Sequence, residues 1–354
     1  MKTWDVIIIG GGIIGLSLAL ALKKRSASVL VVERGEPGRE ASHAAGGMLV
    51  DCQLETPPAF EALATASAQL YPEFAHELEV ESGMKVDLRD NGTILFLSDD
   101  HKNQPRLKAA AVDPVFLRDR EPALDTTEEV CYLEERSIDP RALTAAALKT
   151  AKIRAVDFSS GDPVTSIATA GGQVTGVTTG KTSFAALRVV NCAGAWSGQI
   201  APHTIPTRPV KGQMLCLVMP SRDLLKHVIR SPEAYLIPRS DGRLLVGATV
   251  EEAGFDKRTD PATIQGLHQA ALKLVPKLRD ARILEDWAGL RPGTPDGLPI
   301  LGATATRGYY VATGHFRDGI LLAPITAEIM SKVVADADPQ CDLTPFSPSR
   351  FSPY

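Results

Sequence analysis

The sequence predicts an α/β fold, α+β overall, in which one domain is assembled from distant segments and a second, mostly antiparallel β-sheet domain lies between them. Three observations predict this class. A glycine-rich strand-turn-helix-strand unit opens the chain at 6–33, a β-hairpin lies at 234–250, and a strand-turn-helix unit follows at 309–334. A chain of 354 residues accommodates one large domain or two intermingled ones.

The composition is that of an ordinary globular protein, with 44% hydrophobic and 23% charged residues. The net charge of −4 gives no reason to expect nucleic acid or an anionic membrane as a partner. The five cysteines are widely scattered, without a CxxC pair or ligand spacing, so neither a metal site nor a disulfide framework is indicated. Reduced thiols and a cytoplasmic location fit this pattern.

The start of the chain shares one feature with secretory signal peptides, because Lys2 precedes an apolar run from Val6 to Leu22. Asp5 and several glycines interrupt this pattern, and a basic triplet ends it. We therefore expect the segment to belong to the fold. No other stretch of the sequence is long and apolar enough to span a bilayer.

The opening unit has the residue order of a nucleotide-binding βαβ element. Val6–Ile9 is a short run of β-branched residues, typical of a buried parallel strand. The motif GGGIIG starts at Gly10 and leads into helical periodicity through Leu22. A second apolar run, Val29–Val32, ends at Glu33.

Each part of this unit has a physical reason in a Rossmann-like dinucleotide site. Gly10 allows the tight strand-to-helix turn, Gly12 lets a pyrophosphate approach the backbone, and Gly15 lets helix and strand pack closely. The pyrophosphate rests on the helix N-terminus, while Glu33 accepts both ribose hydroxyls and repels a 2′-phosphate. A purely structural glycine turn is the alternative, which the complete order of parts disfavours. The unit alone does not distinguish NAD from FAD.

The middle of the chain predicts helices and then strands. Helical periodicity predicts a helix at Pro58–Val80, and Asn91-Gly92 predicts a turn into the strand TILFL. Two further helices are expected to begin at Asp113-Pro114 and Asp139-Pro140, the second extending through Lys149. Strand-like segments follow at 164–168, 173–179 and 187–197.

A hairpin is expected next, because AYLIPRS and GRLLVGATV flank Asp241-Gly242, a strong turn signal. A helix is expected at Pro261–Leu274 with Asp260 as its cap. The remaining segments are expected to form a proline- and glycine-rich loop at 287–302, a strand at Tyr309–Thr313 and a helix at Ile320–Val334.

The segment TGHFRDGILLAP brings a charged side chain to the start of that last helix. Arg317 lies in a glycine-bracketed turn, and a helix N-terminus beginning near Gly319 carries unpaired N–H groups and partial positive charge. Together they attract negative charge. The alternative is that Arg317 pairs with Asp318 in solvent, a contact worth about 0–1 kcal/mol.

Several separate stretches resemble one family, the D-amino-acid-oxidase-like flavoproteins. They are VIIIGGGIIGLSLALAL with Glu33, SHAAGGML, VVNCAGAWS, AGLRPGTPDGLPILG and GHFRDGILLAP. The resemblance extends from about Asp5 to Ile329. Within the family, the last two stretches look most similar to the glycine oxidases of the thiamine pathway.

The resemblance implies FAD, held without a covalent link, in place of NAD. It implies oxidation of glycine and related small amines, such as sarcosine or small D-amino acids, to the imine by hydride transfer to flavin N5. O2 would be reduced to H2O2, and the imine would supply the thiazole of thiamine or hydrolyse to glyoxylate and ammonia. A homo-oligomer without integral membrane contact is also implied.

The resemblance also divides the chain into two domains. Residues 1–85, 140–210 and 285–354 are expected to form a discontinuous FAD-binding domain, and residues 86–139 and 211–284 the substrate-binding domain. The residues expected to contact FAD are Gly10, Gly12, Ile13, Ile14, Gly15, Glu33, Arg34, Ser42, Ala44, Ala45, Gly46, Gly47, Met48, Val164, Ala193, Gly194, Trp196, Arg291, His315, Phe316, Arg317, Asp318, Gly319 and Ile320.

Within this set, the resemblance implies particular roles. The stretch 44–48 would line the isoalloxazine, and the backbone of Val164 would contact the adenine. A second nucleotide-contacting turn would fall at 193–196. His315 is expected to have a structural hydrogen bond rather than to act as a base.

By match to the family, three residues are expected at the reacting end of the site. Arg291, on a stiff loop at a strand end, would clamp the substrate carboxylate through two parallel hydrogen bonds. Tyr235 would donate a further bond. Arg317 would either share the carboxylate, in support of Arg291, or gate the pocket entrance, and the first role is preferred. Without the resemblance, a surface arginine that caps loop carbonyls and a cross-strand aromatic fit the spacing equally well. Met48 and Val250 complete the expected substrate pocket.

Two positions depart from the glycine-oxidase pattern. Val250 stands where the pattern has a pocket methionine, and Glu233 stands where it has a histidine just before the tyrosine-bearing strand. Both departures bear on the identity of the substrate more than on the type of reaction.

Other functions stay open at this stage. The same scaffold serves a dehydrogenase of D-amino acids, sarcosine or proline that passes electrons to a quinone or another non-O2 acceptor. A non-catalytic nucleotide sensor would not need Arg291 and Tyr235 beside a flavin. An NAD-dependent dehydrogenase is disfavoured, because the glycine turn near Gly319 has no evident role in an NAD domain. Cys341 lies beyond the last predicted helix, so no cysteine falls where a covalent flavin link would need one.

Overall fold

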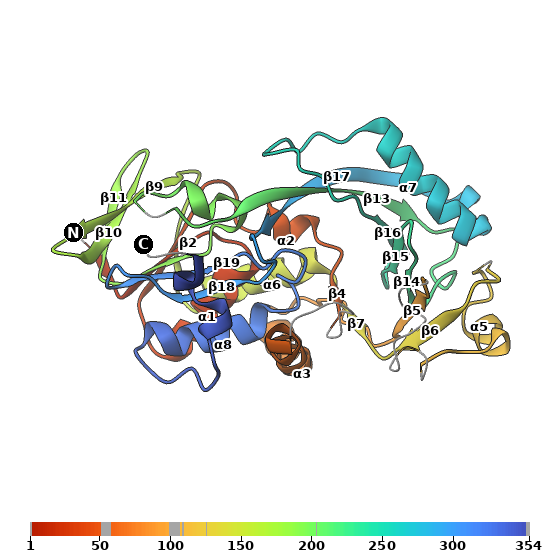
Figure 1. Ribbon diagram of the computed structural model, residues 1–354, viewed down its shortest axis with the longest axis horizontal. Helices are drawn as coiled ribbons and strands as arrows, with labels where there is room; N and C mark the ends of the chain where they lie inside the picture. The colour runs from red at the N-terminus through yellow and green to blue at the C-terminus, as the bar shows by residue number, and fades with distance from the viewer. Residues whose placement is uncertain are drawn as a thin grey trace.

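The computed structural model describes residues 2–50, 58–98, 107, 110–124, 126–202 and 204–351. Their strands form a mostly parallel sheet, a larger mostly antiparallel sheet and two smaller sheets, so the predicted fold class is confirmed. In Figure 1 the long strands β13 (Arg208–Val218) and β17 (Arg282–Gly293) run between the two main parts of the molecule.

The parallel sheet is assembled from distant segments of the chain, as predicted. Only its edge strand β18 runs antiparallel to its neighbour. Its strands, in order across the sheet, are β18 (Ile300–Ala303), β19 (Tyr309–Thr313), β12 (Val189–Asn191), β2 (Val6–Ile9), β3 (Val29–Glu33) and β8 (Asp157–Ser160).

Both faces of this sheet are covered, which explains why β2 is apolar throughout. Ile8 packs into the cluster formed with the helices, and Ile7 packs into the cluster on the opposite face. The helices are α1 (Ile13–Lys24), α3 (Pro58–Ser82), α6 (Pro140–Ile153) and α8 (Ala323–Val334). The opposite face is covered by a small sheet of β1 (Thr3–Trp4), β11 (Ser183–Ala186), β10 (Gln173–Thr179) and β9 (Val164–Ala170).

The larger sheet has one face toward helix α7 (Pro261–Leu274) and the other toward the parallel sheet. Along β13, Leu215 packs with α7 while Met214 and Cys216 face the opposite way, the alternation expected of a strand. The strands, in order, are β17, β13, β16 (Arg243–Gly247), β15 (Tyr235–Pro238), β14 (Val228–Arg230), β5 (Thr93–Phe96) and β6 (Val130–Leu133).

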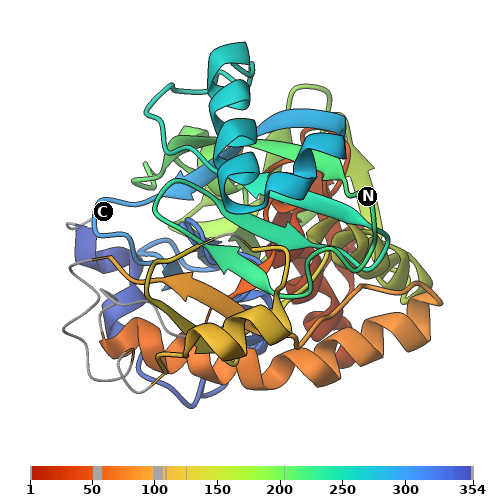
Figure 2. The ribbon, with the colours of Figure 1, turned by 90° about the vertical axis from the view of Figure 1, so that its right-hand side faces the viewer.

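In Figure 2, helix α3 in orange and helix α7 in cyan lie on opposite sides of the molecule.

The remaining elements are short. The short elements are α2 (Ala41–Ala44), β4 (Met48–Leu49), α5 (Pro114–Arg120), β7 (Arg136–Ser137), and the 3-10 helices η1 (Gly194–Gln199), η2 (Pro276–Asp280), η3 (Thr344–Phe346) and η4 (Pro348–Phe351). None of the helices in the described part of the chain is both long and apolar enough to cross a membrane.

The predicted helix caps are confirmed. The carboxylate of Asp113 accepts from the N–H of Phe116, that of Asp139 from Arg141, and that of Asp260 from Thr263. In each case a proline follows in the first turn, where its missing N–H costs nothing. The hairpin of β15 and β16 is confirmed as well.

Two predictions about the C-terminal third are wrong. The segment expected as a loop at 287–302 begins with the second half of β17 and ends in β18. Strand β17 is an edge strand, so Pro292 can lie within it although it lacks an N–H.

The last helix begins at Ala323, not at Ile320 or near Gly319. A turn precedes it, in which the N–H of Leu322 donates to the carbonyl of Asp318.

The expected division into two domains follows the sheets only in outline, because β13 and β17 cross its boundaries. We retain the division as a proposal. The position of the cavity between the two sheets does not depend on it.

Candidate active site

A cavity of about 900 Å³ lies between the parallel sheet and the larger sheet. This volume is near the upper end of the usual range for ligand pockets, about 300–1,000 Å³. The residues that line it come from the ends of β2 and β3, from the segment 38–48, and from the face of the larger sheet opposite α7. A cavity of this size has room for a dinucleotide and a small second ligand.

The glycines of the first turn are required by close backbone contacts. Gly10 has a φ of +105°, and a Cβ there would lie 2.4 Å from the carbonyl oxygen of Cys192. A Cβ on Gly15 would lie 2.0 Å from the carbonyl oxygen of Gly10. Gly15 does not line the cavity, and its close approach to the Gly10 carbonyl packs the helix against the turn.

The polar groups around this turn suit a pyrophosphate and a ribose. The buried carboxylate of Glu33 accepts the N–H of Gly11 at 2.7 Å and that of Gly35 at 2.9 Å. Helix α1 presents its first N–H groups here, and Ser42 Oγ accepts one of them, from Ile13, at 2.9 Å. Glu33 retains lone pairs for ribose hydroxyls, and the helix N-terminus attracts a diphosphate.

The loop 250–258 crosses from the larger sheet to this nucleotide end. The ring of Phe255 lies 5.3 Å, centroid to centroid, from the ring of Trp196, and Lys257 Nζ lies 3.0 Å from Glu40 Oε2. On Trp196, the guanidinium of Arg34 lies 4.3 Å from the ring centroid. Trp196, Arg34 and Glu40 all line the cavity. Because the loop contacts Trp196 and Glu40, it covers this part of the cavity.

The small residues at 44–47 allow a flat ligand to lie between the sheets. A Cβ on Gly289 would lie 2.3 Å from the Cβ of Ala44, so the two segments are already in close contact. Trp287 Nε1 donates to the carbonyl of Ala44 at 3.1 Å, and buried Arg239 donates to the carbonyl of Gly46. These bonds fix the backbone along one wall of the cavity.

The register of the larger sheet aligns a row of residues across it. Arg230 pairs with Tyr235, Tyr235 with Gly247, Gly247 with Met214, and Met214 with Trp287. A Cβ on Gly247 would lie 2.5 Å from the ring of Tyr235, so this glycine provides the space that the aromatic ring occupies. Arg230, Tyr235 and Met214 all line the cavity.

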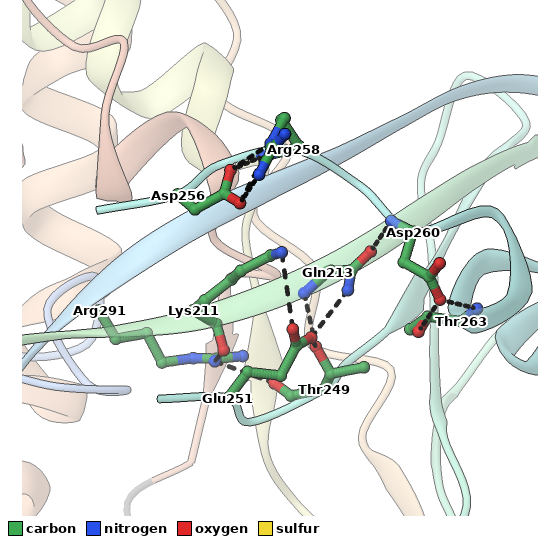
Figure 3. Close-up of polar contacts among 9 residues, drawn as sticks. All are labelled: Lys211, Gln213, Thr249, Glu251, Asp256, Arg258, Asp260, Thr263 and Arg291. Carbon is green, nitrogen blue, oxygen red and sulfur yellow. Dashed lines mark hydrogen bonds and ion pairs between the residues drawn. The ribbon is translucent and has the colours of Figure 1, made fainter. Parts of the chain in front are cut away.

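Arg291 lies on β17 with its guanidinium against the backbone of β13. Its Nη1 donates to the carbonyl of Thr249 at 3.0 Å and to that of Lys211 at 3.3 Å. A Cβ on Gly212 would lie 2.3 Å from the same nitrogen. Figure 3 shows the side chain of Arg291 extending toward Thr249 and Glu251.

A polar network holds the segment that carries Thr249. Glu251 accepts from Gln213 Nε2 at 2.8 Å and from the hydroxyl of Thr249, and Lys211 Nζ lies 3.5 Å from its other oxygen. The carbonyl of the Gln213 side chain accepts the N–H of Asp260 at 2.6 Å. Lys211 and Gln213 are buried, so the network fixes the carbonyl to which Arg291 donates (Figure 3).

Arg291, Arg317 and Tyr235 line one part of the cavity and influence one another's charge. Burial raises the pKa of Tyr235, against the opposing charge of Arg291, so its hydroxyl keeps its proton at neutral pH. That hydroxyl donates to Sδ of Met214 at 3.8 Å. Burial lowers the pKa of Arg291, Tyr235 opposes that change, and the charge of Arg317 adds to it. Two guanidiniums and a phenol that lie close enough to influence one another are hydrogen-bond donors of the kind that suits a carboxylate.

The turn at 314–318 holds one buried side chain, His315, and one exposed side chain, Arg317. His315 is buried, its Nε2 lies 3.1 Å from Thr326 Oγ1, and burial lowers its pKa to about 3. The imidazole is therefore neutral at physiological pH and tied to α8. Arg317 is exposed, with its guanidinium 5.1 Å from the ring of Phe316.

The structure brings almost all of the sequence-predicted site residues together. Gly15 alone of that set lies outside the cavity lining. Glu233 also lies outside the lining and pairs with Lys273 at 3.5 Å, so that departure from the family pattern does not alter the cavity wall. Val250 lines the cavity and is 56% exposed. Direct contact of each residue with a bound cofactor or substrate stays a prediction.

Sequence reasoning missed several lining residues, of which Arg230, Gly212 and Met214 are examples. One signal for Arg230 was present, because the turn residues SPEA separate VIR from YLIP and so place Arg230 opposite Tyr235. Within the described residues, no group of three or more His, Cys, Asp and Glu side chains is arranged to hold a metal ion.

Comparison with known proteins agrees with this geometry. Residues 5–333 match the family model described as FAD dependent oxidoreductase, DAO. The chain is 38% identical to the bifunctional protein ThiO/ThiG of Synechocystis over 99% of its own length, and 32% identical to the glycine oxidase of Pseudomonas putida over 97%.

The chain spans 54% of the bifunctional protein and 98% of the glycine oxidase. It therefore covers about half the length of the bifunctional relative. The crystal structure of glycine oxidase from Geobacillus kaustophilus superposes with a TM-score of 0.93 at 30% identity, covering 99% of both chains.

Proposed function

The chain belongs to the DAO family of FAD-dependent oxidoreductases, and we propose on this basis that it oxidises glycine and related small amines to the imine. One observation carries the proposal. Arg291 and Tyr235, whose donors suit a carboxylate, line the same cavity as the glycine turn of Gly10 and Gly12. The similarity to proteins named glycine oxidase supports glycine as the amine.

The residues around the first turn fit FAD. Glu33 would bind the ribose, the N-terminus of α1 the pyrophosphate, and the wall formed by 44–48 the isoalloxazine. When bound, FAD supplies an acceptor for a hydride from the α-carbon. The protein's own task is then to hold the amino acid and to limit its orientations.

Arg291 and Tyr235 perform that task from one end. A guanidinium presents two parallel N–H donors that match a carboxylate, and the protonated phenol adds a third donor. Because Gly212 and the carbonyl of Thr249 fix the guanidinium, the carboxylate is held in one position. The α-carbon of a bound amino acid would then face the rest of the cavity, which Gly46 and Met48 also line.

The amine must lose its proton before a hydride leaves the α-carbon. His315 is not placed to take that proton, because its Nε2 is engaged with Thr326 and its pKa is far below neutrality. The positive charge of Arg291 and Arg317 disfavours the ammonium form of the substrate in the same cavity. The proposed mechanism therefore uses a neutral amine and no strong protein base.

We further propose that electrons pass to O2, giving H2O2, and that the imine supplies thiazole formation for thiamine. The similarity to a bifunctional ThiO/ThiG protein supports this placement.

The test is the variant Arg291→Ala, with Arg118→Ala as the control. Removing one partner of a buried charged pair costs about 2–5 kcal/mol, which predicts a rise in the glycine KM of roughly 30-fold or more with FAD still bound. Arg118 is an exposed residue of helix α5 and does not line the cavity, so its loss leaves the kinetics unchanged. Unchanged glycine kinetics in Arg291→Ala would remove the carboxylate assignment.

A further inference from the structure

We propose that the cavity contains a second anion subsite at Arg230, and that its preferred substrates are small amines with a second carboxylate. The inference rests on the proposed function, because it assigns the first carboxylate to Arg291. It adds no chemical step to the oxidation. It specifies which amines fit the site.

The position of Arg230 follows from the register of the larger sheet. Arg230 ends β14 and is paired directly with Tyr235 on β15. Directly paired residues of neighbouring antiparallel strands point to the same face, with Cβ atoms about 4.5–5.5 Å apart. Arg230 and Tyr235 both line the cavity, so this face is the cavity wall.

Arg230 and Arg291 lie on opposite sides of Tyr235. Tyr235 lies on β15, and the strand on one side of it is β14, which carries Arg230. On the other side come β16 and then β13, and the guanidinium of Arg291 lies against β13. The charge of Arg291 acts on the hydroxyl of Tyr235. A ligand whose first carboxylate is at Arg291 can therefore extend along the wall past the Tyr235 ring toward Arg230.

The guanidinium of Arg230 is anchored at one nitrogen. Its Nη1 lies 3.3 Å from Oε1 and 3.5 Å from Oε2 of Glu135. The Glu135 side chain is only 4% exposed, whereas that of Arg230 is 23% exposed. Nε and Nη2 of Arg230 make no hydrogen bond to any other described residue. A guanidinium has five N–H donors, so most of its donors remain for a ligand.

A structural ion pair alone does not account for this arrangement. Burying an arginine and a glutamate costs desolvation energy, and well-packed apolar residues usually serve a structural purpose as well or better. Glycine has one carboxylate, which Arg291 and Tyr235 satisfy. A second carboxylate supplies the partner that the remaining donors of Arg230 lack, and Glu135 keeps the guanidinium in a fixed orientation to receive it.

A binding experiment tests the subsite without any turnover. The probes are (methylthio)acetate, CH3–S–CH2–COO−, which has one carboxylate, and thiodiacetate, which has two. Both have sulfur in place of the amine and cannot form an imine. The holoenzyme is titrated with each, and the flavin absorbance is followed. We expect thiodiacetate to bind at least tenfold more tightly, and Arg230→Gln to reduce that ratio to about two or less.

Two further variants secure the interpretation. Arg230→Lys keeps the charge but loses the fork of donors, so it should retain part of the ratio; it also serves if Arg230→Gln fails to fold. Arg118→Gln, at an exposed side chain of helix α5 that does not line the cavity, should leave the ratio unchanged. Equal binding of the two probes, or a ratio insensitive to both Arg230 variants, would overturn the subsite.

A second experiment locates the second carboxylate on the substrate. Flavin reduction without oxygen is compared for iminodiacetate against sarcosine. The same comparison is made for aspartate against alanine, using the D and the L enantiomers of these two amino acids. A preference for iminodiacetate puts the second carboxylate on nitrogen, and a preference for aspartate puts it on the side chain; either supports the proposal. Reduction by glycine without preference for either acid contradicts the subsite alone. Failure of every amine to reduce the flavin contradicts the proposed function, and the probe titration still decides the subsite.

Discussion

A Cβ atom on Gly212 would lie 2.3 Å from Nη1 of Arg291, so the guanidinium of Arg291 lies directly against bare backbone of the neighbouring strand. The same nitrogen donates to the carbonyls of Thr249 and Lys211. A buried glycine on β13 therefore determines where the carboxylate-binding group on β17 lies. The two strands pair along most of their length, so the position of Arg291 depends on their register.

The variant Gly212→Ala tests this relationship. The added methyl group overlaps the guanidinium and must displace it, and a displacement of about 1 Å in a positioning group can cost roughly 100-fold in rate. We expect kcat/KM for glycine to fall by about tenfold or more while the FAD content stays normal.

The matched control is Gly266→Ala, in helix α7. A Cβ there meets nothing within 4 Å, and alanine in a helix is favoured over glycine by roughly 0.5–1 kcal/mol. Steady-state kinetics on both variants, with flavin quantified by absorbance, separate the two effects. Equal kinetics for Gly212→Ala and the wild type would show that Arg291 is not positioned by this contact.

The loop 250–258 should slow the release of FAD. Phe255 contacts Trp196 across the nucleotide end, and Lys257 pairs with Glu40. An aromatic pair contributes about 0.5–1.5 kcal/mol beyond its buried area. We expect Phe255→Ala to raise the dissociation rate of FAD by about threefold to tenfold, measured by the fluorescence of released flavin. Val115→Ala, at an exposed apolar residue of α5, is the control. An unchanged release rate in Phe255→Ala would mean that the loop does not retain the cofactor.

His315 should make the protein less stable in mild acid. Burial lowers its pKa to about 3, whereas an unfolded histidine titrates near 6.5, so between these values the unfolded state binds more protons. The free energy of unfolding therefore falls as the pH drops through this window, by about 2 kcal/mol between pH 7.5 and 5 from this group alone. The free energy of unfolding recovers its full value once the pH rises above about 6.5, where the histidine is neutral in the folded and the unfolded state.

The comparison uses His315→Gln, whose amide can keep a hydrogen bond to Thr326. Urea unfolding of the wild type and the variant at pH 7.5 and pH 5 measures the difference. We expect the variant to lose about 2 kcal/mol less stability than the wild type over this range. Parallel pH dependence of the two proteins would show that His315 titrates normally in the folded state.

Those parts of the fold that depend on neighbouring residues could be predicted from the sequence. The turn at Gly10 and the helix caps at Asp113, Asp139 and Asp260 are set within a few residues of chain, and each was predicted correctly. Glycine and proline at these places restrict the backbone whatever the rest of the molecule does.

The parts that depend on distant pairing could not be predicted in the same way. The stretch around Arg291 contains proline and glycine and was predicted as a loop, yet pairing with β13 makes it an edge strand. Arg230 is one side chain in a short polar-flanked strand, and only its register with Tyr235 brings it into the cavity. The start of the last helix was placed too early, because the bond from Leu322 to Asp318 closes a turn before Ala323.

The central claim is that a bound flavin and a glycine site share one cavity. The most direct measurement is the visible absorbance of the purified protein without oxygen, before and after adding glycine, followed by admission of air. We predict a yellow protein that bleaches with glycine and recovers its colour in air with formation of H2O2. A protein that neither carries FAD nor binds added FAD, or whose bound flavin no amine reduces, would contradict the account.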